Sequence, residues 1–160
     1  MTDAAQSQAD QQPIFNIEKL YVKDLSLEVP NAPQCFLERE APEVQVQLAT
    51  TGTGVGEAIF DVALTVTVTA KIKDKTLFLV EVAQAGLFHI RNVPEQELEP
   101  IIAVACPNIL FPFAREVVAD AVTRAGFPPV LLAPVNFELM YRQRLEQQAQ
   151  AGAESPTPIQ

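Results

Sequence analysis

The 160-residue chain has no tryptophan, one histidine and two cysteines, and these shortages exclude several classes of function. Cys35 and Cys106 lie far apart and form no Cys-X-X-Cys pair, so we expect reduced, partly buried thiols. The one histidine, His89, stands in a strand-like pattern with no acid placed beside it by a motif. We therefore predict no metal, no cofactor and no enzymatic activity. An enzyme that uses Cys106 is a minor alternative, because no motif supplies a base for the thiol.

Basic residues are also scarce, with 11 Lys and Arg against 20 Asp and Glu, for a net charge of −9. An acidic chain without a basic stripe is repelled by nucleic acid and by anionic lipid, and it favours a cationic protein partner. No apolar run reaches the length of a membrane-spanning helix, so we expect no direct membrane insertion. Residues 1–12 lack the apolar segment that a signal peptide contains, and the expected location is therefore cytoplasmic.

The composition predicts one globular domain with polar ends. Hydrophobic residues make up 48% of the chain, which is enough for a core of ordinary size. Residues 1–12 have almost nothing to bury and are predicted to form a disordered arm. Residues 13–149 form the predicted domain, and residues 150–160, rich in Pro, Ala and Ser, form a predicted disordered tail.

Four segments have the alternation of β-strands. In the first, residues 14–29, simple alternation places Tyr21, Leu25 and Leu27 on one side of the strand. It places Val22 and Asp24 on the other side. A half-exposed strand follows around Val44, Val46 and Leu48, and the glycine-rich residues 50–56 are expected to be a flexible hairpin loop. Strand 58–71 alternates most clearly. Strand 76–90 is apolar on both faces, so both faces need a cover, which another subunit would partly supply.

The C-terminal half reads as helices. Residues 94–105 start with acids and form the first predicted helix. The stretch Cys106–Glu116, with two prolines and two phenylalanines, leads into a helix that ends at Gly126. A second proline-rich apolar segment, 126–137, has the same character and precedes a last helix capped by Asn136. Strands first and helices second predict an α+β fold.

Several of these segments resemble the SecB family of bacterial protein-export chaperones. They are Tyr21–Pro33, Leu64–Ala70, Cys106–Glu116 and Leu132–Phe137, in the expected order, and the resemblance covers about residues 14–148. It implies a four-stranded antiparallel sheet with helices on one face and a homotetramer built as a dimer of dimers. It also implies that the protein holds unfolded preproteins without ATP and passes them to the translocation ATPase SecA.

The resemblance also implies three sets of site residues. The SecA-binding face corresponds to Asp24, Glu28, Leu79 and Glu81. The strand associated with tetramer assembly corresponds to Val80, Val82 and Gln84. The peptide groove lies between the first inter-strand loop and the last helix, and corresponds to Phe36, Leu37, Phe111, Phe113, Phe137 and Tyr141.

A soluble carrier of a small apolar ligand is the main alternative function. Such a carrier needs an enclosed cavity inside one chain, whereas a chaperone for unfolded chains needs an open groove. The shape of the apolar site therefore discriminates between the two.

Overall fold

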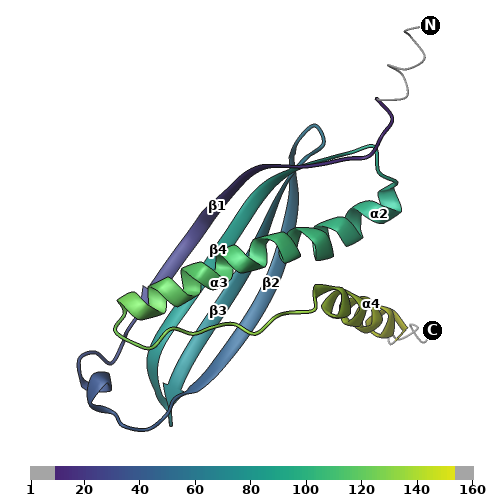
Figure 1. The fold of residues 1–160 in the computed structure, drawn as a ribbon. Coiled ribbons are helices and arrows are strands. Elements are labelled where there is room, and N and C mark those ends of the chain that lie inside the picture. Colours follow the sequence, from purple (N-terminus) through teal and green to yellow (C-terminus); the bar gives the residue numbers. More distant parts are fainter. Residues whose placement is uncertain (1–9, 154–160) are drawn as a thin grey trace, which may run out of the picture.

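The computed structural model describes residues 10–153, which form a four-stranded sheet with helices on one face (Figure 1). Neighbouring strands are all antiparallel, and their order across the sheet is β1-β4-β3-β2. The strands are β1 (Ile14–Glu28), β2 (Glu43–Gly56), β3 (Ile59–Ile72) and β4 (Lys75–Arg91). This arrangement confirms the predicted α+β class, and it makes β1 and β2 the two edge strands.

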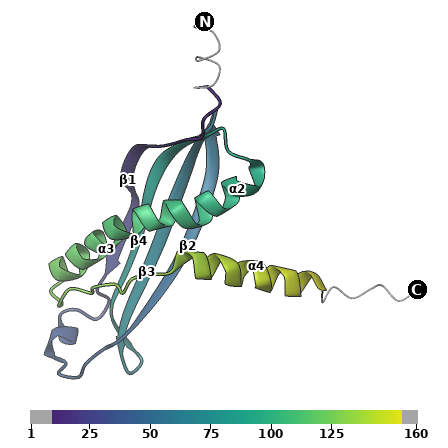
Figure 2. The ribbon, with the colours of Figure 1, turned by 45° about the vertical axis from the view of Figure 1, so that its right-hand side comes forward.

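The helical layer is one long rod followed by a separate helix. The rod consists of α2 (Glu95–Pro100), the π-helical segment η2 (Ile101–Ala105) and α3 (Cys106–Arg124), so the proline-rich stretch 106–116 is itself helical. The widened π turns fall between Pro100 and Pro107, two residues that have no backbone N–H to donate within a helix. Helix α4 (Phe137–Ala153) projects away beyond β2 (Figure 2). A short 3-10 helix, η1 (Gln34–Leu37), lies in the β1–β2 connection.

The hydrophobic core lies between α3 and the two central strands. Alternate residues of β3 and β4 point at α3 and are fully buried, as the period of two requires. They pack against residues of α3 that recur at helical spacing. The residues that form this interface are Val62, Leu64, Val66, Val68, Val80, Val82, Phe88, Leu110, Ala114, Val118 and Val122.

Residues 50–56 are not the flexible loop that their glycines predicted. They continue β2 to its last residue, and the turn falls at Glu57 and Ala58, where Ala58 has a φ of 57°. Gly52 has a packing reason, because a Cβ added there would lie 2.5 Å from Cγ2 of Ile102. The absence of a side chain at Gly52 therefore lets the π-helical segment pack against β2. The prediction of a loop considered only the backbone freedom of glycine and could not reveal this contact.

Strand β1 does not alternate simply, because it contains two irregularities. They fall between Ile17 and Lys19 and between Val22 and Asp24. The second shifts the alternation by one residue, so Tyr21 shares a face with Asp24 and not with Leu25. The predicted faces of Tyr21 and Val22 were therefore wrong, since an inserted residue reverses the side on which the preceding residues lie.

The ends of the domain differ from the predicted boundaries. Residues 1–9 of the predicted arm lie outside the described residues, but residues 10–12 are held by Asn92, whose Nδ2 donates to the carbonyls of Asp10 (2.7 Å) and Gln12 (3.0 Å). At the other end α4 continues to Ala153, so residues 150–153 of the predicted tail are helical. Gln and Ala are good helix formers, which explains the extension. Residues 154–160 lie outside the described part.

Candidate functional site: an apolar groove and an acidic sheet face

The floor of an apolar groove is the helix-facing side of edge strand β2. Helix α3 packs on β4 and β3, and the rod crosses β2 through η2 near Gly52, which leaves the first half of this side of β2 without a helix on it (Figure 1). Val44 is 41% exposed and Val46 is 46% exposed, although their side chains point to the same side as the core. Exposed aliphatic side chains in a row beside a helix offer a surface to an apolar partner.

The opposite wall is the extended segment between α3 and α4. It forms a hollow of about 630 Å³ with β2, lined by Pro129, Val130, Leu131 and Val135 among others. Two further hollows, of about 450 Å³ and about 310 Å³, continue the groove at its ends. Because consecutive hollows share the lining residues Val44 and Leu48 of β2, they form one groove along the first half of the strand.

Aromatic rings surround the end of the groove near the β1–β2 connection. Phe36 stacks on Phe127 with ring centroids 5.1 Å apart, and Phe127 in turn lies 5.0 Å from Phe78. Gly126, with a φ of 94°, supports this arrangement, because a Cβ there would lie 3.1 Å from the Phe36 ring. The carboxylates of Glu38 and Glu40 border the same hollow. This end combines aromatic surface with negative charge.

The other end of the groove is formed where α4 begins. Asn136 caps the helix by accepting a hydrogen bond from the Leu139 N–H at 2.9 Å, as predicted. The cap fixes Phe137, which is buried against Phe111 with ring centroids 5.9 Å apart. One turn later, Tyr141 lines the hollow and carries the guanidinium of a following arginine over its ring. This end is apolar with a polar rim.

Of the six predicted groove residues, four line the groove and two do not. Phe36, Phe111, Phe137 and Tyr141 lie in its three hollows. Leu37 is 74% exposed and Phe113 is 42% exposed, and neither lines any of these three hollows. Both lie in helical segments, on sides that face solvent rather than the groove.

The sequence pattern did not identify the aliphatic residues that form most of the groove lining. Val44, Val46 and Leu48 form the floor, and Val130 and Leu131 form much of the wall. Two signals could have found them: the half-exposed alternation of β2, and the second proline-rich apolar segment, whose character matches that of the first. What the sequence pattern lacks is any sign that the two segments face each other.

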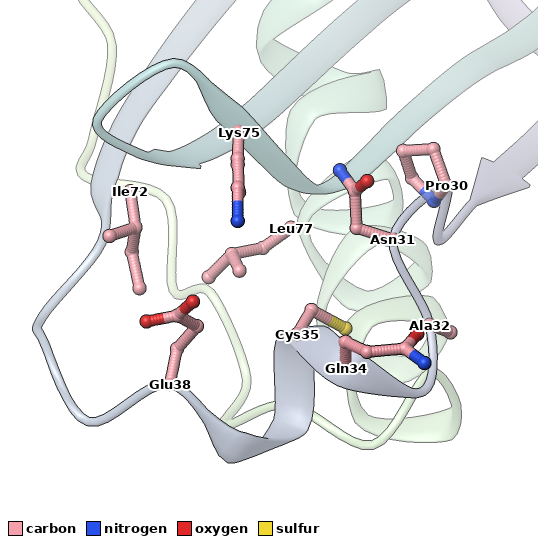
Figure 3. Close-up of a pocket in the computed structure, with 9 residues that line it drawn as sticks. All are labelled: Pro30, Asn31, Ala32, Gln34, Cys35, Glu38, Ile72, Lys75 and Leu77. Atoms are coloured by element: carbon pink, nitrogen blue, oxygen red, sulfur yellow. The ribbon is translucent and has the colours of Figure 1, made fainter.

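A smaller polar cavity of about 260 Å³ adjoins the aromatic end of the groove, beneath the β1–β2 connection (Figure 3). Lys75, Asn31 and Glu38 contribute polar groups to its lining, and Cys35 and Leu77 contribute apolar surface. The Asn31 side chain is already engaged, since its Nδ2 donates to the Thr76 carbonyl at 2.8 Å. That bond attaches the connection to the start of β4 and so holds the aromatic end in place.

The four predicted residues of the acidic face lie together on the side of the sheet that carries no helix, which we call the open face. In the β1–β4 register Glu28 is opposite Leu79, Ser26 is opposite Glu81, and Asp24 follows in step. Directly opposed residues project from the same side of a sheet. Asp24, Glu28 and Glu81 are exposed, and within residues 10–153 none of them is in an ion pair.

The three predicted assembly residues lie in the core of the chain. Val80 and Val82 are fully buried and Gln84 is 3% exposed, all on the side of β4 that faces the helical layer. Val80 and Val82 belong to the core cluster with α3 and lie opposite Leu27 and Leu25 of β1, so any influence on contact between copies would act through these two elements. Gln84 also has no hydrogen-bond partner for its Oε1 in the described structure, which is costly in a core.

The described residues do not bring a reactive group together with a base. Cys106 is fully buried, and burial raises the pKa of its thiol to about 12, so the thiol is protonated at neutral pH. His89, contrary to expectation, has an acid nearby, with Nδ1 3.9 Å from Glu18 Oε1. Across residues 10–153, no group of three His, Cys, Asp or Glu side chains is close enough to hold a metal ion.

One helix within residues 10–153, the rod of residues 95–124, is long and apolar enough by length and composition to cross a bilayer. A third of its apolar window is buried inside the chain. The core helix of a globular fold has the same properties. The expectation that the chain does not insert into a membrane stays a prediction.

An apolar groove that is open along an edge strand is the kind of site that suits an extended polypeptide. The known proteins to which this chain is similar agree with that kind of site. The family model described as "Preprotein translocase subunit SecB" matches residues 8–148. The "Protein-export protein SecB" of Dechloromonas aromatica is 68% identical over 92% of this chain and 97% of its own. That of Chromobacterium violaceum is 63% identical over 91% of this chain and 97% of its own.

A solved structure gives the same fold at low identity. It is a SecB-like chaperone of Mycobacterium tuberculosis, in complex with a peptide from an antitoxin. The structures superpose with a TM-score of 0.64 at 18% identity, covering 82% of this chain and 94% of the other. The chain belongs to the SecB family and is a chaperone for preprotein export.

Proposed function

We propose that this protein holds unfolded preproteins in the groove along β2 and keeps them competent for translocation without ATP. The single observation that carries the proposal is the continuous apolar groove from Phe36 to Tyr141. Unfolded chains expose apolar and aromatic side chains that folded proteins bury, so an open apolar groove selects unfolded clients.

The groove residues that the sequence pattern did not single out belong to this proposal. Val46 and Leu131 are among its most exposed aliphatic residues and are expected to contact the client directly. Leu37 and Phe113 lie apart from the three hollows, and we assign them to secondary contacts with a long client. Glu38 and Glu40 favour clients with basic residues beside the apolar ones.

We also propose that the acidic part of the open face is the docking surface for SecA. The support is the grouping of Asp24, Glu28 and Glu81 around Leu79, without neutralising partners within residues 10–153. The groove and this surface lie on opposite faces of the sheet, so SecA and a client would bind at the same time. Attraction between exposed charges speeds encounter and weakens as salt is added.

The proposed assembly is a homotetramer built as a dimer of dimers. Its support is a row of exposed apolar residues on β1 that lies on the helix-bearing side but beyond the reach of α3, namely Phe15, Ile17, Val22, Leu25 and Leu27. An uncovered apolar edge strand favours pairing with another chain. Several grooves in one tetramer would hold one long client through many weak contacts.

The acid surplus and the family support further parts of the proposal. We infer that the protein acts in the cytoplasm, has no cofactor and no enzymatic activity, and does not bind nucleic acid. A carrier of small apolar molecules is disfavoured, because the groove is bordered by half-exposed residues such as Val44 and Val46 and is not enclosed.

Suppression of aggregation is the direct test. A purified preprotein is diluted from denaturant with and without this protein, and light scattering records its aggregation. We expect suppression at one tetramer per client, unaffected by ATP. Loss of suppression in Val46→Lys, with suppression retained in Gln47→Lys on the opposite side of β2, would assign the activity to the groove. No suppression by the unaltered protein would contradict the proposed function.

A further inference from the structure

The bulge in β1 decides which side chains the acidic face presents. Before the bulge Val22 is opposite Gln84, and after it Asp24 is opposite Ala83, so Lys23 is the inserted residue. With simple alternation, Val22 and Asp24 would lie on the same side of the strand. The bulge instead sends Val22 to the helix-bearing side and Asp24, with Glu28, to the open face.

A single carboxylate from another strand accepts hydrogen bonds from a residue just before the bulge and from the inserted residue. Tyr21 Oη donates to Asp61 Oδ1 at 2.7 Å, and Lys23 Nζ donates to Asp61 Oδ2 at 2.6 Å. Asp61 is on β3, and β4 lies between it and β1. The two donors therefore reach across a whole strand to the same acid, one from before the insertion and one from the inserted residue itself.

Small residues of β4 make this reach possible. Ala85 lies opposite Tyr21 on one side and opposite Ala63 on the other, so no large side chain of β4 stands between Tyr21 and Ala63 on the open face, whereas Leu87 lies opposite Asp61 itself. Ala85 is fully buried although this face carries no helix, as expected if the Tyr21 ring lies over it. Asp61 is also well covered, with 11% of its side chain exposed.

The charges in the cluster are mutually satisfied. Burial pushes the pKa of Asp61 upward, but the hydrogen bonds from Lys23 and Tyr21 and the Lys23 charge outweigh it and lower the pKa below its ordinary value. The hydrogen bond to Asp61 is the main cause of the raised pKa of Tyr21. Since the Lys23 ammonium is engaged by Asp61, it does not neutralise the adjacent Asp24.

We propose that Asp61 is a positioning residue for the acidic docking surface: it clamps the bulge at Lys23 and thereby fixes the side of β1 from which Asp24 and Glu28 project. This inference rests on the proposed SecA-docking function. Asp61 itself lies away from the four residues of that surface and need not touch the partner.

The test compares Asp61→Asn with four other variants of the full-length assembled protein, namely Asp61→Glu, Lys23→Met/Asp61→Asn, Asp24→Asn and Glu81→Lys, measuring SecA affinity by calorimetry at low salt. We expect Asp61→Asn to weaken SecA binding about tenfold, within the range usual for coupled neighbouring sites. Asp61→Glu keeps both acceptor oxygens and should restore most of the affinity. The double variant Lys23→Met/Asp61→Asn restores the net charge without the clamp and should stay weak. Suppression of client aggregation should be unchanged throughout.

A spectroscopic signature checks the cluster itself. The chain has two tyrosines and no tryptophan, so tyrosine ionisation is easily followed by near-ultraviolet absorbance. In the unaltered protein Tyr21 should ionise above the ordinary pH of about 10, and Asp61→Asn should remove that delay.

The possible failures are distinguishable. If Asp61→Asn binds SecA normally while Glu81→Lys does not, the positioning role is wrong and the docking surface stands. Recovery of affinity in the double variant would assign the effect to net charge and overturn the clamp. Loss of client holding together with SecA binding would indicate general structural damage and would also overturn it. If Glu81→Lys and Asp24→Asn both bind SecA normally, the docking surface itself is wrong.

Discussion

At the scale of single residues, Gly126 and Asp61 determine where the side chains of the site lie. Gly126 lets the chain leave α3 and pass directly under Phe36, and Asp61 joins two strands that are not neighbours. Neither residue lines the acidic surface, and only Gly126 borders the groove. Residues of this kind act by fixing where other side chains lie.

Replacing Gly126 with alanine should damage the aromatic end of the groove. Its φ of 94° is unfavourable for any residue with a Cβ, and the new methyl group would meet the Phe36 ring at 3.1 Å. We expect the free energy of unfolding to fall by about 1 to 2 kcal/mol, and client affinity to fall as Phe36 shifts. Urea denaturation and peptide titration measure the two effects.

Gly152 offers the matched control for that substitution. It lies in α4 with no atom within 4 Å of an added Cβ. Gly152→Ala should leave client affinity unchanged and stability unchanged or slightly higher. Equal losses in both variants would contradict the role assigned to Gly126.

The Asp61 cluster also predicts a pH dependence of stability. Because the pKa of Asp61 is lower in the folded protein than in the unfolded chain, its contribution is present above pH of about 4. It is lost as the pH falls through the folded pKa. Unfolding midpoints of the unaltered protein and of Asp61→Asn should therefore differ at neutral pH and converge in acid. A difference that is independent of pH would show that the charge of Asp61 is not involved.

At the scale of elements, the groove exists because the helical rod covers only part of the sheet. Helix α3 packs on β3 and β4, and the following segment 126–136 runs beside β2 without closing over it. The apolar side of β2 is thus left between two walls. The opposite side of the same strand carries glutamines and threonines and faces away.

Strand β2 therefore allows a charge to be placed on either side of one element. Val46→Lys should weaken client binding about tenfold, since a charge must be desolvated in an apolar groove. Because Val46 is 46% exposed, stability should change by less than about 0.5 kcal/mol. Affinity for a labelled unfolded preprotein is the measurement. Gln47→Lys adds the same charge on the other side, and an equal loss there would contradict the groove.

At the scale of the whole molecule, both edge strands carry uncovered apolar residues on the helix-bearing side. On β2 they belong to the groove, and on β1 they form the row proposed to face a second copy. In the proposed function, one side of the sheet serves client binding and assembly, and the open face serves docking. Three kinds of partner would then contact one small domain without competing.

Assembly through β1 is tested by Leu25→Lys. Leu25 is 50% exposed, so the fold should tolerate the change, whereas a buried unpaired lysine at an interface is strongly unfavourable. We expect light scattering to report a smaller particle than the unaltered protein forms. Ser26→Lys, on the open face of the same strand, should keep the full mass. A full-size assembly in Leu25→Lys would place the interface elsewhere.

Much of the fold follows from local pattern. The alternation in β3 and the helical spacing in α3 are enough to identify the buried faces, because burial requires apolar residues at those periods. Four of the groove residues that the resemblance implied lie along the hollows and the acidic set lies on one face, and the roles of these residues stay predictions. The β1 bulge escaped prediction because it is held by Asp61, a contact between distant residues. The groove floor was not predicted because the exposure of Val46 depends on which strands α3 packs against.

The sequence by itself determined the class of fold, the apolar faces of β3 and α3, the acid surplus and the family. Only the tertiary structure decided which apolar face stays uncovered and which side of β1 carries Asp24. It also decided that Phe111, and not Phe113, lines the groove. The physical reason is that periodicity reports the side of an element that avoids water. Whether the same chain covers that side depends on contacts between residues far apart in the sequence.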